Sequence, residues 1–162
     1  MKYACFAGGC FWCITPVFEE TEGVTSVRCG YSGGSREDAV YEKVKSQTTL
    51  HREALRVEYD ETKIDFARLI DVFTSSVDPF DGGGQFIDRG RSYTLAVYYT
   101  SDAEREEAEE KVALLEKESG RKVFISVEEL VSFYEAEEYH QDYYVKNPEK
   151  FEEELKTSGR KG

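Results

Sequence analysis

Short apolar segments alternate with polar ones along the chain, and their periods predict both strands and helices. Between residues 54 and 59, apolar and polar side chains alternate with the period of a half-buried strand. Asp65 precedes apolar residues spaced three and four apart, which indicates a capped amphipathic helix. By the same criteria, strands are predicted at 3–7, 24–31, 54–59, 93–99 and 123–127, and helices at 14–21, at 37–45, from 65 onward, and from Ser101 to near Gly120.

The order of these elements predicts the architecture. Strand pairs are joined by helices and long loops rather than by a regular strand–helix–strand series. We therefore expect an α+β two-layer sandwich with a mixed or antiparallel sheet, built as a ferredoxin-like core with extra helices and long loops. Residues 78–91 are rich in Gly, Asp and Pro and predict a long loop, and loops of that length in compact domains are often functional.

Length and charge limit the class of protein. At 162 residues the chain is about one domain long and can bury a core without disulfides. We expect a single catalytic domain over 1–162, with a polar peripheral tail from about 147. A net charge of -12 disfavours nucleic acids and anionic membranes as partners. The sequence shows no membrane-length apolar stretch and no signal-peptide pattern, so a cytoplasmic location is expected.

The thiol of Cys10 is the first candidate for chemistry. Gly8 and Gly9 let the backbone turn tightly between a predicted strand and a helical segment, and they leave the sulfur unshielded. Unpaired amides and the positive end of the helix dipole predict a lowered thiol pKa and a reactive thiolate. Phe11 and Trp12 follow where a turn usually carries small polar residues. They indicate an apolar surface beside the sulfur and a small apolar substrate.

All four cysteines lie in the first fifth of the chain. Cys10 and Cys13 form a C-x-x-C pair, which fits a redox pair, half of a zinc site completed by Cys5 and Cys29, or a single nucleophile with an incidental neighbour. Zinc is disfavoured because there is no second C-x-x-C and two bulky aromatic residues separate the ligands. A thioredoxin fold is disfavoured because its motif normally follows a whole strand–helix–strand unit. The single nucleophile is the preferred interpretation, and no metal site is expected.

Several residues could supply an acid, hydrogen bonds or a base. If Glu53 is buried beside the thiol, its pKa rises and it can donate a proton near neutral pH; the alternative is a solvated glutamate at the end of a strand. Tyr31 and Tyr93 offer phenolic donors to an oxygen, or simply pack in strands. His51 or His140 could serve as the base of a cysteine hydrolase, although neither lies in a local signature for that role.

Several short motifs occur together in an order that a known family shares. They are Gly9-Cys10-Phe11-Trp12, Gly30-Tyr31-Ser32-Gly33-Gly34, His51-Arg52-Glu53-Ala54, Asp78-Pro79, Gln85 to Gly90 followed by Tyr93, and Tyr139-His140-Gln141 before Lys146-Asn147-Pro148. From about Tyr3 to Pro148, the chain resembles the A-type peptide methionine sulfoxide reductases, which are selective for the S epimer. The resemblance implies thiol-dependent reduction of methionine S-sulfoxide, protein-bound or free, through a cysteine sulfenic acid. It thus implies an oxidoreductase that repairs proteins after oxidative stress.

The resemblance also implies a role for each site residue. Cys10 would attack the sulfoxide sulfur as a thiolate, and Glu53, held protonated, would give a proton to the departing oxygen. The other residues would surround the substrate: Tyr31 and Tyr93 at the oxygen, Phe11 and Trp12 at the methyl group, and Asp88 and His140 in the polar network, with Asp88 nearer to the substrate or its water.

The chain departs from the commonest family pattern in how the sulfenic acid would be reduced. Many relatives carry recycling cysteines in a C-terminal tail, whereas residues 144–162 contain none. One route is an external thiol, such as thioredoxin, glutaredoxin, glutathione or, in vitro, dithiothreitol (DTT). The other routes are Cys13, which ranks equally, and Cys29, which ranks behind; Cys5 is expected in the core. No bound cofactor is expected.

The predicted loop departs from the family pattern as well. Phe86-Ile87 stands where the family usually has Gly-Asn, and Ser92-Tyr93-Thr94-Leu95 where it has Gln-Tyr-Arg-Ser. The tyrosine is kept, so the role at the oxygen is retained, whereas contacts with the substrate backbone can differ. The preference between protein-bound and free methionine sulfoxide therefore stays open.

Two other functions fit parts of the pattern. A cysteine-dependent hydrolase or acyl transferase would use Cys10 with a histidine and form an acyl-enzyme. A zinc or redox-sensing module would use the four cysteines without catalysis. For the reductase, the expected partners are methionine sulfoxide and a thiol reductant, with no nucleic acid and no membrane, and a monomer is expected.

Overall fold

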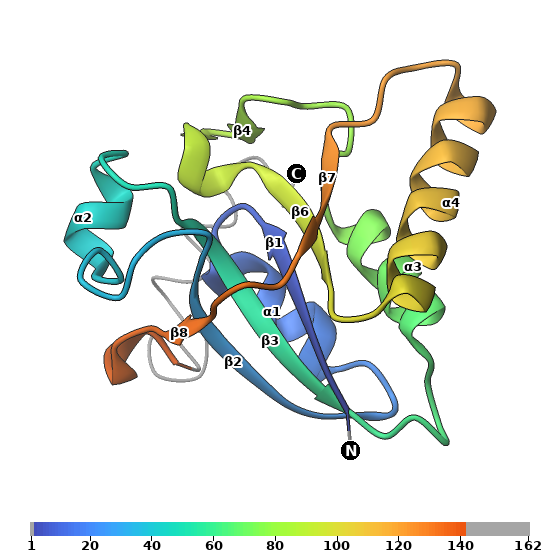
Figure 1. The fold of residues 1–162 in the computed structure, drawn as a ribbon, viewed down its shortest axis with the longest axis horizontal. Helices are drawn as coiled ribbons and strands as arrows, with labels where there is room; N and C mark the ends of the chain where they lie inside the picture. The colour runs from blue at the N-terminus through green and yellow to red at the C-terminus, as the bar shows by residue number, and fades with distance from the viewer. Residues whose placement is uncertain (1, 142–162) are drawn as a thin grey trace.

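The computed structural model describes residues 2–141, in which strands and helices alternate (Figure 1). The predicted tail from about 147 lies outside these residues. The strands are β1 (Lys2–Gly8), β2 (Val24–Ser32), β3 (Arg52–Tyr59), β4 (Gly84–Gln85), β5 (Asp88–Arg89), β6 (Leu95–Tyr99), β7 (Ile125–Glu129) and β8 (Tyr134–Glu135). The helices are α1 (Phe11–Glu19), α2 (Tyr41–Lys45), α3 (Phe66–Ser76) and α4 (Asp102–Ser119), with 3₁₀ turns at Arg91–Tyr93 and Glu138–His140.

The main sheet is mixed and has the order β7-β6-β1-β3-β2-β8. Neighbouring strands from β6 through β1, β3 and β2 to β8 pair antiparallel. In contrast, β6 and β7 are direct parallel neighbours, and α4 connects them in the chain. The succession β1-α1-β2-β3-α3-β6, with β1 and β3 at the centre, is the ferredoxin-like β-α-β-β-α-β arrangement. The predicted α+β sandwich with a mixed sheet is confirmed.

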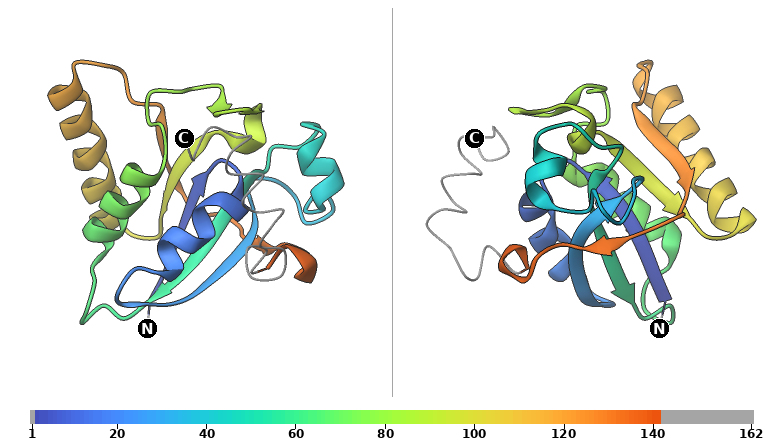
Figure 2. Two further views of the ribbon diagram at one scale, coloured as in Figure 1. Left: turned by 180° about the vertical axis from the view of Figure 1, so that it is seen from behind. Right: turned by 60° about the vertical axis from the view of Figure 1, so that its left-hand side comes forward.

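The two faces of the sheet are covered differently. Helices α1 and α3 lie on one face, which Figure 2 shows from behind, and the segment between β7 and β8 crosses the other face (Figure 1). On the helix side, the Phe6 ring stacks against Phe18 and Phe73, each at 5.3 Å between ring centroids. On the other side, Leu130 and Phe133 pack against a smaller cluster of buried residues. Burial on both faces fixes which side chains of β1 and β3 point toward α1.

The start of α1 differs from the prediction, and the difference places the thiol. The helix is predicted at 14–21, where Pro16 is the residue type that favours the first turn, but α1 begins at Phe11 and Pro16 lies inside it. A proline this close to the N-terminus removes only one backbone hydrogen bond. The Thr15 hydroxyl also donates to the Phe11 carbonyl at 2.6 Å. As a result, Cys10 is the N-cap residue itself.

Predictions that rest on local signals are confirmed, and those that needed longer patterns are partly wrong. Asp65 caps α3 by accepting the Arg68 N–H at 2.8 Å, and Ser101 caps α4 by accepting the Glu104 N–H at 3.2 Å. The helix predicted at 37–45 is shorter and consists of α2 alone. The predicted loop 78–91 contains the β4–β5 hairpin, and Tyr93 lies in a 3₁₀ turn before β6 rather than in the strand. The strand predicted as the last is shifted to β7, and β8 follows it. A strand as short as β8 has no periodicity to detect.

Candidate active site

Cys10 lies at the turn between β1 and α1. Gly9 has a φ of +86°, a conformation that glycine adopts without strain, so the chain turns within one residue. Gly8 allows the strand to approach the helix closely, because a Cβ there would lie 2.7 Å from Ile14 Cδ1. The Cys10 side chain makes no capping hydrogen bond and is 8% exposed. The thiol is therefore nearly enclosed at one end of the sheet.

The predicted lowering of the Cys10 pKa is wrong for this structure. A hydrogen bond with Cys13, then burial, and then the negative charges of Glu53 and Asp88 raise the pKa of Cys10 well above its usual range. These effects oppose the helix N-terminus, whose influence is limited to the first turn. Cys10 therefore rests as a thiol in this structure.

Glu53 reaches the thiol from β3, where its backbone pairs with Tyr31 of β2. Its Oε1 accepts the Phe11 N–H at 3.2 Å, one of the donors that the first turn of a helix leaves without a helical partner. Burial raises the pKa of Glu53 from 4.5 to about 8, against this hydrogen bond. Among the residues that the structure describes, none makes a hydrogen bond to Oε2, which is also buried. At neutral pH Glu53 is largely a neutral acid, and its second oxygen has no hydrogen-bond partner within residues 2–141.

Asp88 and Tyr93 approach the site from the segment between α3 and β6. Asp88 begins β5, and its charge raises the pKa of both Cys10 and Glu53. Burial, followed by the charge of Glu53, raises the pKa of Tyr93, so its hydroxyl stays protonated. The Tyr93 hydroxyl in turn lowers the pKa of Glu53. The fold thus brings four residues predicted from the sequence into one electrostatic group.

Aromatic rings cover the first turn of α1. Phe11 is only 1% exposed, and its ring centroid lies 5.9 Å from that of Tyr31 and 5.4 Å from that of His140. Trp12 is partly exposed, and its Nε1–H donates to His140 Nδ1 at 3.2 Å. Burial lowers the pKa of His140, so the ring is neutral and can accept this hydrogen bond. The Trp12 ring is therefore partly open to solvent and is held by His140.

The Tyr31 hydroxyl has a partner that the sequence did not indicate. It donates to Glu137 Oε1 at 2.8 Å, and Glu137 Oε2 accepts the backbone N–H of Tyr41 at 3.2 Å. Sequence reasoning missed both partners of this network. Glu137 stands three residues before His140 in an acidic stretch, where nothing distinguishes it from its acidic neighbours. Tyr41 lies within the helix predicted at 37–45, and that prediction gives it no part in the site.

The two histidines do not form a base for Cys10. His51 Nδ1 accepts the Gly34 N–H at 3.1 Å, and Nε2 lies 2.7 Å from the Ser35 carbonyl oxygen. His51 therefore supports the glycine-rich turn after β2. His140 is engaged by Trp12, and the groups that shift the pKa of Cys10 include neither histidine. This geometry disfavours the cysteine hydrolase.

The other cysteines differ in their distance from the reaction site. Cys13 lies in the first turn of α1 and hydrogen-bonds to Cys10. The Cys29 sulfur lies 3.3 Å from the Thr15 hydroxyl in the core. Cys5 belongs to the cluster on the opposite face, where burial raises its pKa to about 12. Within residues 2–141, no group of three His, Cys, Asp or Glu side chains could hold a metal ion.

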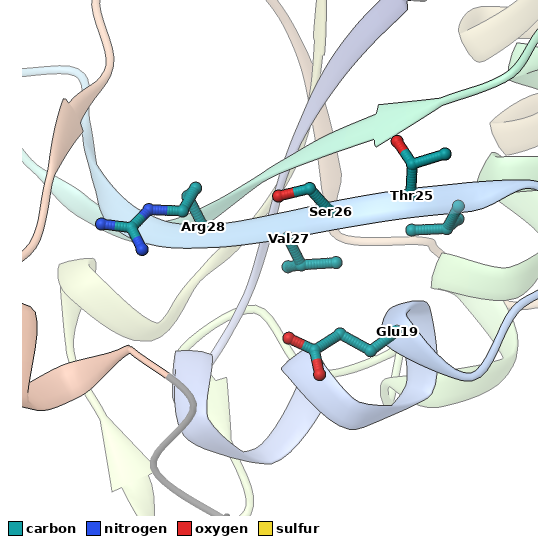
Figure 3. Close-up of a pocket in the computed structure, with 6 residues that line it drawn as sticks. Glu19, Thr25, Ser26, Val27 and Arg28 are labelled. Atoms are coloured by element: carbon teal, nitrogen blue, oxygen red, sulfur yellow. The ribbon is translucent and has the colours of Figure 1, made fainter.

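A surface groove on α1 is separate from this site. It has a volume of about 360 Å³ and is lined by Glu19 and residues 24–28. Figure 3 shows Glu19 at the end of α1, facing the side of β2 from which Val27 projects. Because Cys10 precedes the first residue of the same helix, about 14 Å along the helix axis separates it from Glu19. The groove contains no thiol and takes no part in the arrangement around Cys10.

A thiol at a helix N-cap with a buried carboxylic acid beside it suits thiol redox chemistry, as a cysteine-dependent oxidoreductase requires. A family model described as peptide methionine sulfoxide reductase matches residues 2–161, and the chain belongs to this family. It is a thiol-dependent reductase of methionine S-sulfoxide. Across residues 2–141 no helix is long and apolar enough to cross a membrane.

Individual relatives agree with this assignment over nearly the whole chain. Peptide methionine sulfoxide reductase MsrA of Bacillus licheniformis is 44% identical, covering 99% of this chain and 90% of the relative. MsrA of Ligilactobacillus salivarius is 45% identical, covering 91% and 87%. Among solved structures, reduced Mxr1 of Saccharomyces cerevisiae matches with a TM-score of 0.86 at 29% identity, covering 91% of this chain and 86% of that one.

Proposed function

We propose that Cys10 attacks the sulfur of methionine S-sulfoxide while Glu53 protonates the departing oxygen. The buried Glu53 carboxyl carries this proposal, because its pKa of about 8 keeps much of it protonated at neutral pH. The Phe11 N–H holds one carboxyl oxygen, and the other has no partner among residues 2–141. A proton donor is thus held beside the nucleophile.

The reaction balances without a further reagent. The substrate sulfur gains two electrons and becomes a thioether, and the Cys10 sulfur gains the oxygen and becomes a sulfenic acid. The proton that Glu53 gives to the oxygen is replaced by the one that the Cys10 thiol loses. A bound sulfoxide brings a partly positive sulfur next to Cys10, which favours the thiolate at the moment of attack. At rest the raised pKa keeps Cys10 protonated and less open to unproductive oxidation.

The remaining site residues bind and orient the substrate in this proposal. Trp12 receives the methyl group, with Phe11 behind it and His140 fixing its ring. Tyr93 stays protonated and donates to the sulfoxide oxygen. Asp88 belongs to the polar network, and its negative charge keeps Glu53 protonated.

We propose Cys13 as the thiol that resolves the sulfenic acid. It already hydrogen-bonds to Cys10, and its backbone N–H donates to the Cys10 carbonyl at 3.0 Å, so a modest adjustment brings the two sulfurs within disulfide reach. Because Cys10 is the N-cap with φ -60° and ψ 118°, its backbone is not yet helical and the first turn need not unwind. Attack by the Cys13 thiol on the Cys10 sulfenic acid gives a disulfide and water. Cys29 is the weaker candidate, since its sulfur lies against Thr15 in the core.

A dithiol protein of the thioredoxin class is the proposed reductant of this disulfide. In support, Mxr1, whose reduced form is 29% identical to this chain, is also found in complex with Trx2. Glutaredoxin, glutathione and DTT are further reductants of the same chemistry. The enzyme is proposed to act in the cytoplasm as a monomer on protein-bound or free methionine sulfoxide. The four cysteines occur as thiols, which suits a reducing compartment, and the net charge of -12 opposes self-association.

Mass spectrometry without a reductant tests both the nucleophile and the resolving thiol. We expect one equivalent of methionine S-sulfoxide to release methionine and to leave the wild-type protein lighter by two hydrogens. In Cys13→Ser this loss is expected to disappear, and dimedone should instead label Cys10. Multiple turnovers with thioredoxin should fall at least tenfold in this variant, while the single turnover remains. Cys29→Ser is the matched control and should behave like the wild type. Dimedone labelling of the wild type to the same extent would refute the role of Cys13, and a missing methionine signal would refute the role of Cys10.

A further inference from the structure

We propose that Glu137 is a positioning residue that fixes the direction of the Tyr31 hydrogen bond in the active site. This inference rests on the proposed role of Glu53 and on the place beside the substrate oxygen that the family resemblance implies for Tyr31. The Tyr31 hydroxyl donates to Glu137 Oε1 at 2.8 Å. A phenol has one proton to donate and two lone pairs that accept. With its proton committed to Glu137, Tyr31 can act on the substrate only as an acceptor.

Glu137 is well held for this role. Its Oε2 accepts the backbone N–H of Tyr41 at 3.2 Å and lies 3.5 Å from the Tyr139 hydroxyl oxygen. These hydrogen bonds outweigh partial burial and keep the pKa of Glu137 below its usual range, so it remains a carboxylate. By contrast, the neighbouring Glu138 is exposed and binds Arg28 at the surface. Of these two glutamates, Glu137 is the one that contacts Tyr31.

Tyr31 is placed to meet the substrate oxygen at one stage of the reaction. It pairs with Glu53 across β2 and β3, and its ring lies against Phe11 in the first turn of α1. A sulfoxide oxygen has no proton, so it can only accept a hydrogen bond and gains nothing from a Tyr31 that is itself an acceptor. Once Glu53 has protonated it, the oxygen is a hydroxyl that can donate to Tyr31 Oη.

The two tyrosines therefore act in opposite directions. Tyr93 donates to the unprotonated oxygen, whereas Tyr31 accepts from the protonated one. An interaction that forms only as the proton is transferred stabilises the transition state more than the bound substrate, and it raises kcat rather than affinity. The Glu137 carboxylate also pulls on the Tyr31 proton and makes Tyr31 Oη a stronger acceptor.

A double-mutant cycle of Glu137→Gln and Tyr31→Phe tests this arrangement. The readout is methionine released in a single turnover from methionine S-sulfoxide, so that reduction of the oxidised enzyme plays no part. Replacing a charged acceptor by a neutral one should lower the maximal rate of Glu137→Gln about tenfold. The substrate concentration at half-maximal rate should change less than about twofold. In the Tyr31→Phe background the same substitution should have less than about a twofold effect, because the hydroxyl on which Glu137 acts is gone.

Glu138→Gln is the matched control, one residue away on the surface, and should keep the wild-type rate. Thermal melting confirms that each variant is folded at the assay temperature. If Glu137→Gln is not folded, the cycle is run with Glu137→Asp, which keeps the charge but withdraws it from Tyr31 by one methylene.

An equal loss of rate with and without the Tyr31 hydroxyl would show a merely structural role and overturn the inference. If Tyr31→Phe slows the reaction but Glu137→Gln does not, only this inference fails. A wild-type rate in Tyr31→Phe would also refute the proposed role of Tyr31.

Discussion

Glu53→Gln is expected to lower kcat for methionine sulfoxide reduction by about 100- to 10,000-fold, the range typical of losing a general acid. Glutamine keeps an oxygen that can accept the Phe11 N–H, so the packing beside Cys10 is retained. It has no acidic proton to give to the departing oxygen. The wild-type rate should also fall as the pH rises through about 8, where Glu53 loses its proton. Initial rates between pH 6 and 9.5 with saturating DTT measure both effects.

The same substitution should stabilise the protein, and this separates a catalytic loss from a folding defect. The pKa of Glu53 is raised from 4.5 to about 8 on folding, so between these pH values the unfolded chain binds fewer protons than the folded one. The raised pKa of Glu53 therefore does not lower the free energy of unfolding below about pH 4.5. It lowers this free energy progressively as the pH rises, and the full loss is reached above about pH 8. At pH 7 this lowers the free energy of unfolding of the wild type by about 3 kcal/mol. That figure is the upper limit of the stabilisation by Glu53→Gln, because the glutamine amide is also buried and its burial has a cost of its own.

We expect the melting temperature of Glu53→Gln relative to wild type to rise between pH 5 and 8. Glu58→Gln, on the same strand but only partly buried, is the control for the loss of one negative charge. An active Glu53→Gln enzyme with an unchanged pH profile would mean that another group supplies the proton. A melting difference that does not depend on pH would mean that Glu53 is ionised in the folded protein.

Gly30→Ala is expected to destabilise the protein by about 2–3 kcal/mol and to impair the site at the same time. A Cβ at Gly30 would collide with the Tyr134 carbonyl oxygen and with the Phe133 ring. The carbonyl belongs to the backbone of β8, so the strand must move away from β2 as a whole. The chain that follows β8 carries Glu137 and His140, and activity should therefore fall with stability.

Urea unfolding measures the loss of stability, and single-turnover rates measure the loss of activity. Gly83→Ala is the matched control, because a Cβ there meets only the end of the flexible Arg89 side chain, at 2.7 Å from Nη2. It should change stability by less than about 0.5 kcal/mol. A Gly30→Ala protein as stable as the control would show that β8 is not held tightly against β2.

The elements predicted correctly are those encoded by neighbouring residues. Asp65 and Ser101 cap helices that follow them directly, and the alternation in β3 requires only that one face be buried. The errors arose where a local signal competes with packing. Pro16 usually marks the start of a helix, yet α1 starts five residues earlier because its first turn packs against the sheet. β8 forms only because β2 offers an open edge to a segment distant in sequence.

The candidate site shows the same division. The motif around Cys10 and the order of the other motifs were sufficient to name the family, and the matches over residues 2–161 confirm it. The individual residue roles remain proposals. Placing Glu53 beside Cys10 requires the register of β3 against β1 and β2, which no local pattern contains. The link between Tyr31 and Glu137 joins residues 106 positions apart.

The sequence by itself determined the family and the absence of recycling cysteines in 144–162, because these depend on which residues are present and in what order. Only the tertiary structure decided the protonation states. A helix N-terminus alone predicts a Cys10 thiolate, but burial, Cys13, Glu53 and Asp88 raise its pKa. A glutamate at a strand end is normally ionised, but burial makes Glu53 an acid with a pKa of about 8. The reason is that a pKa depends on solvent exclusion and on charges brought close by folding, and residues adjacent in the chain specify neither.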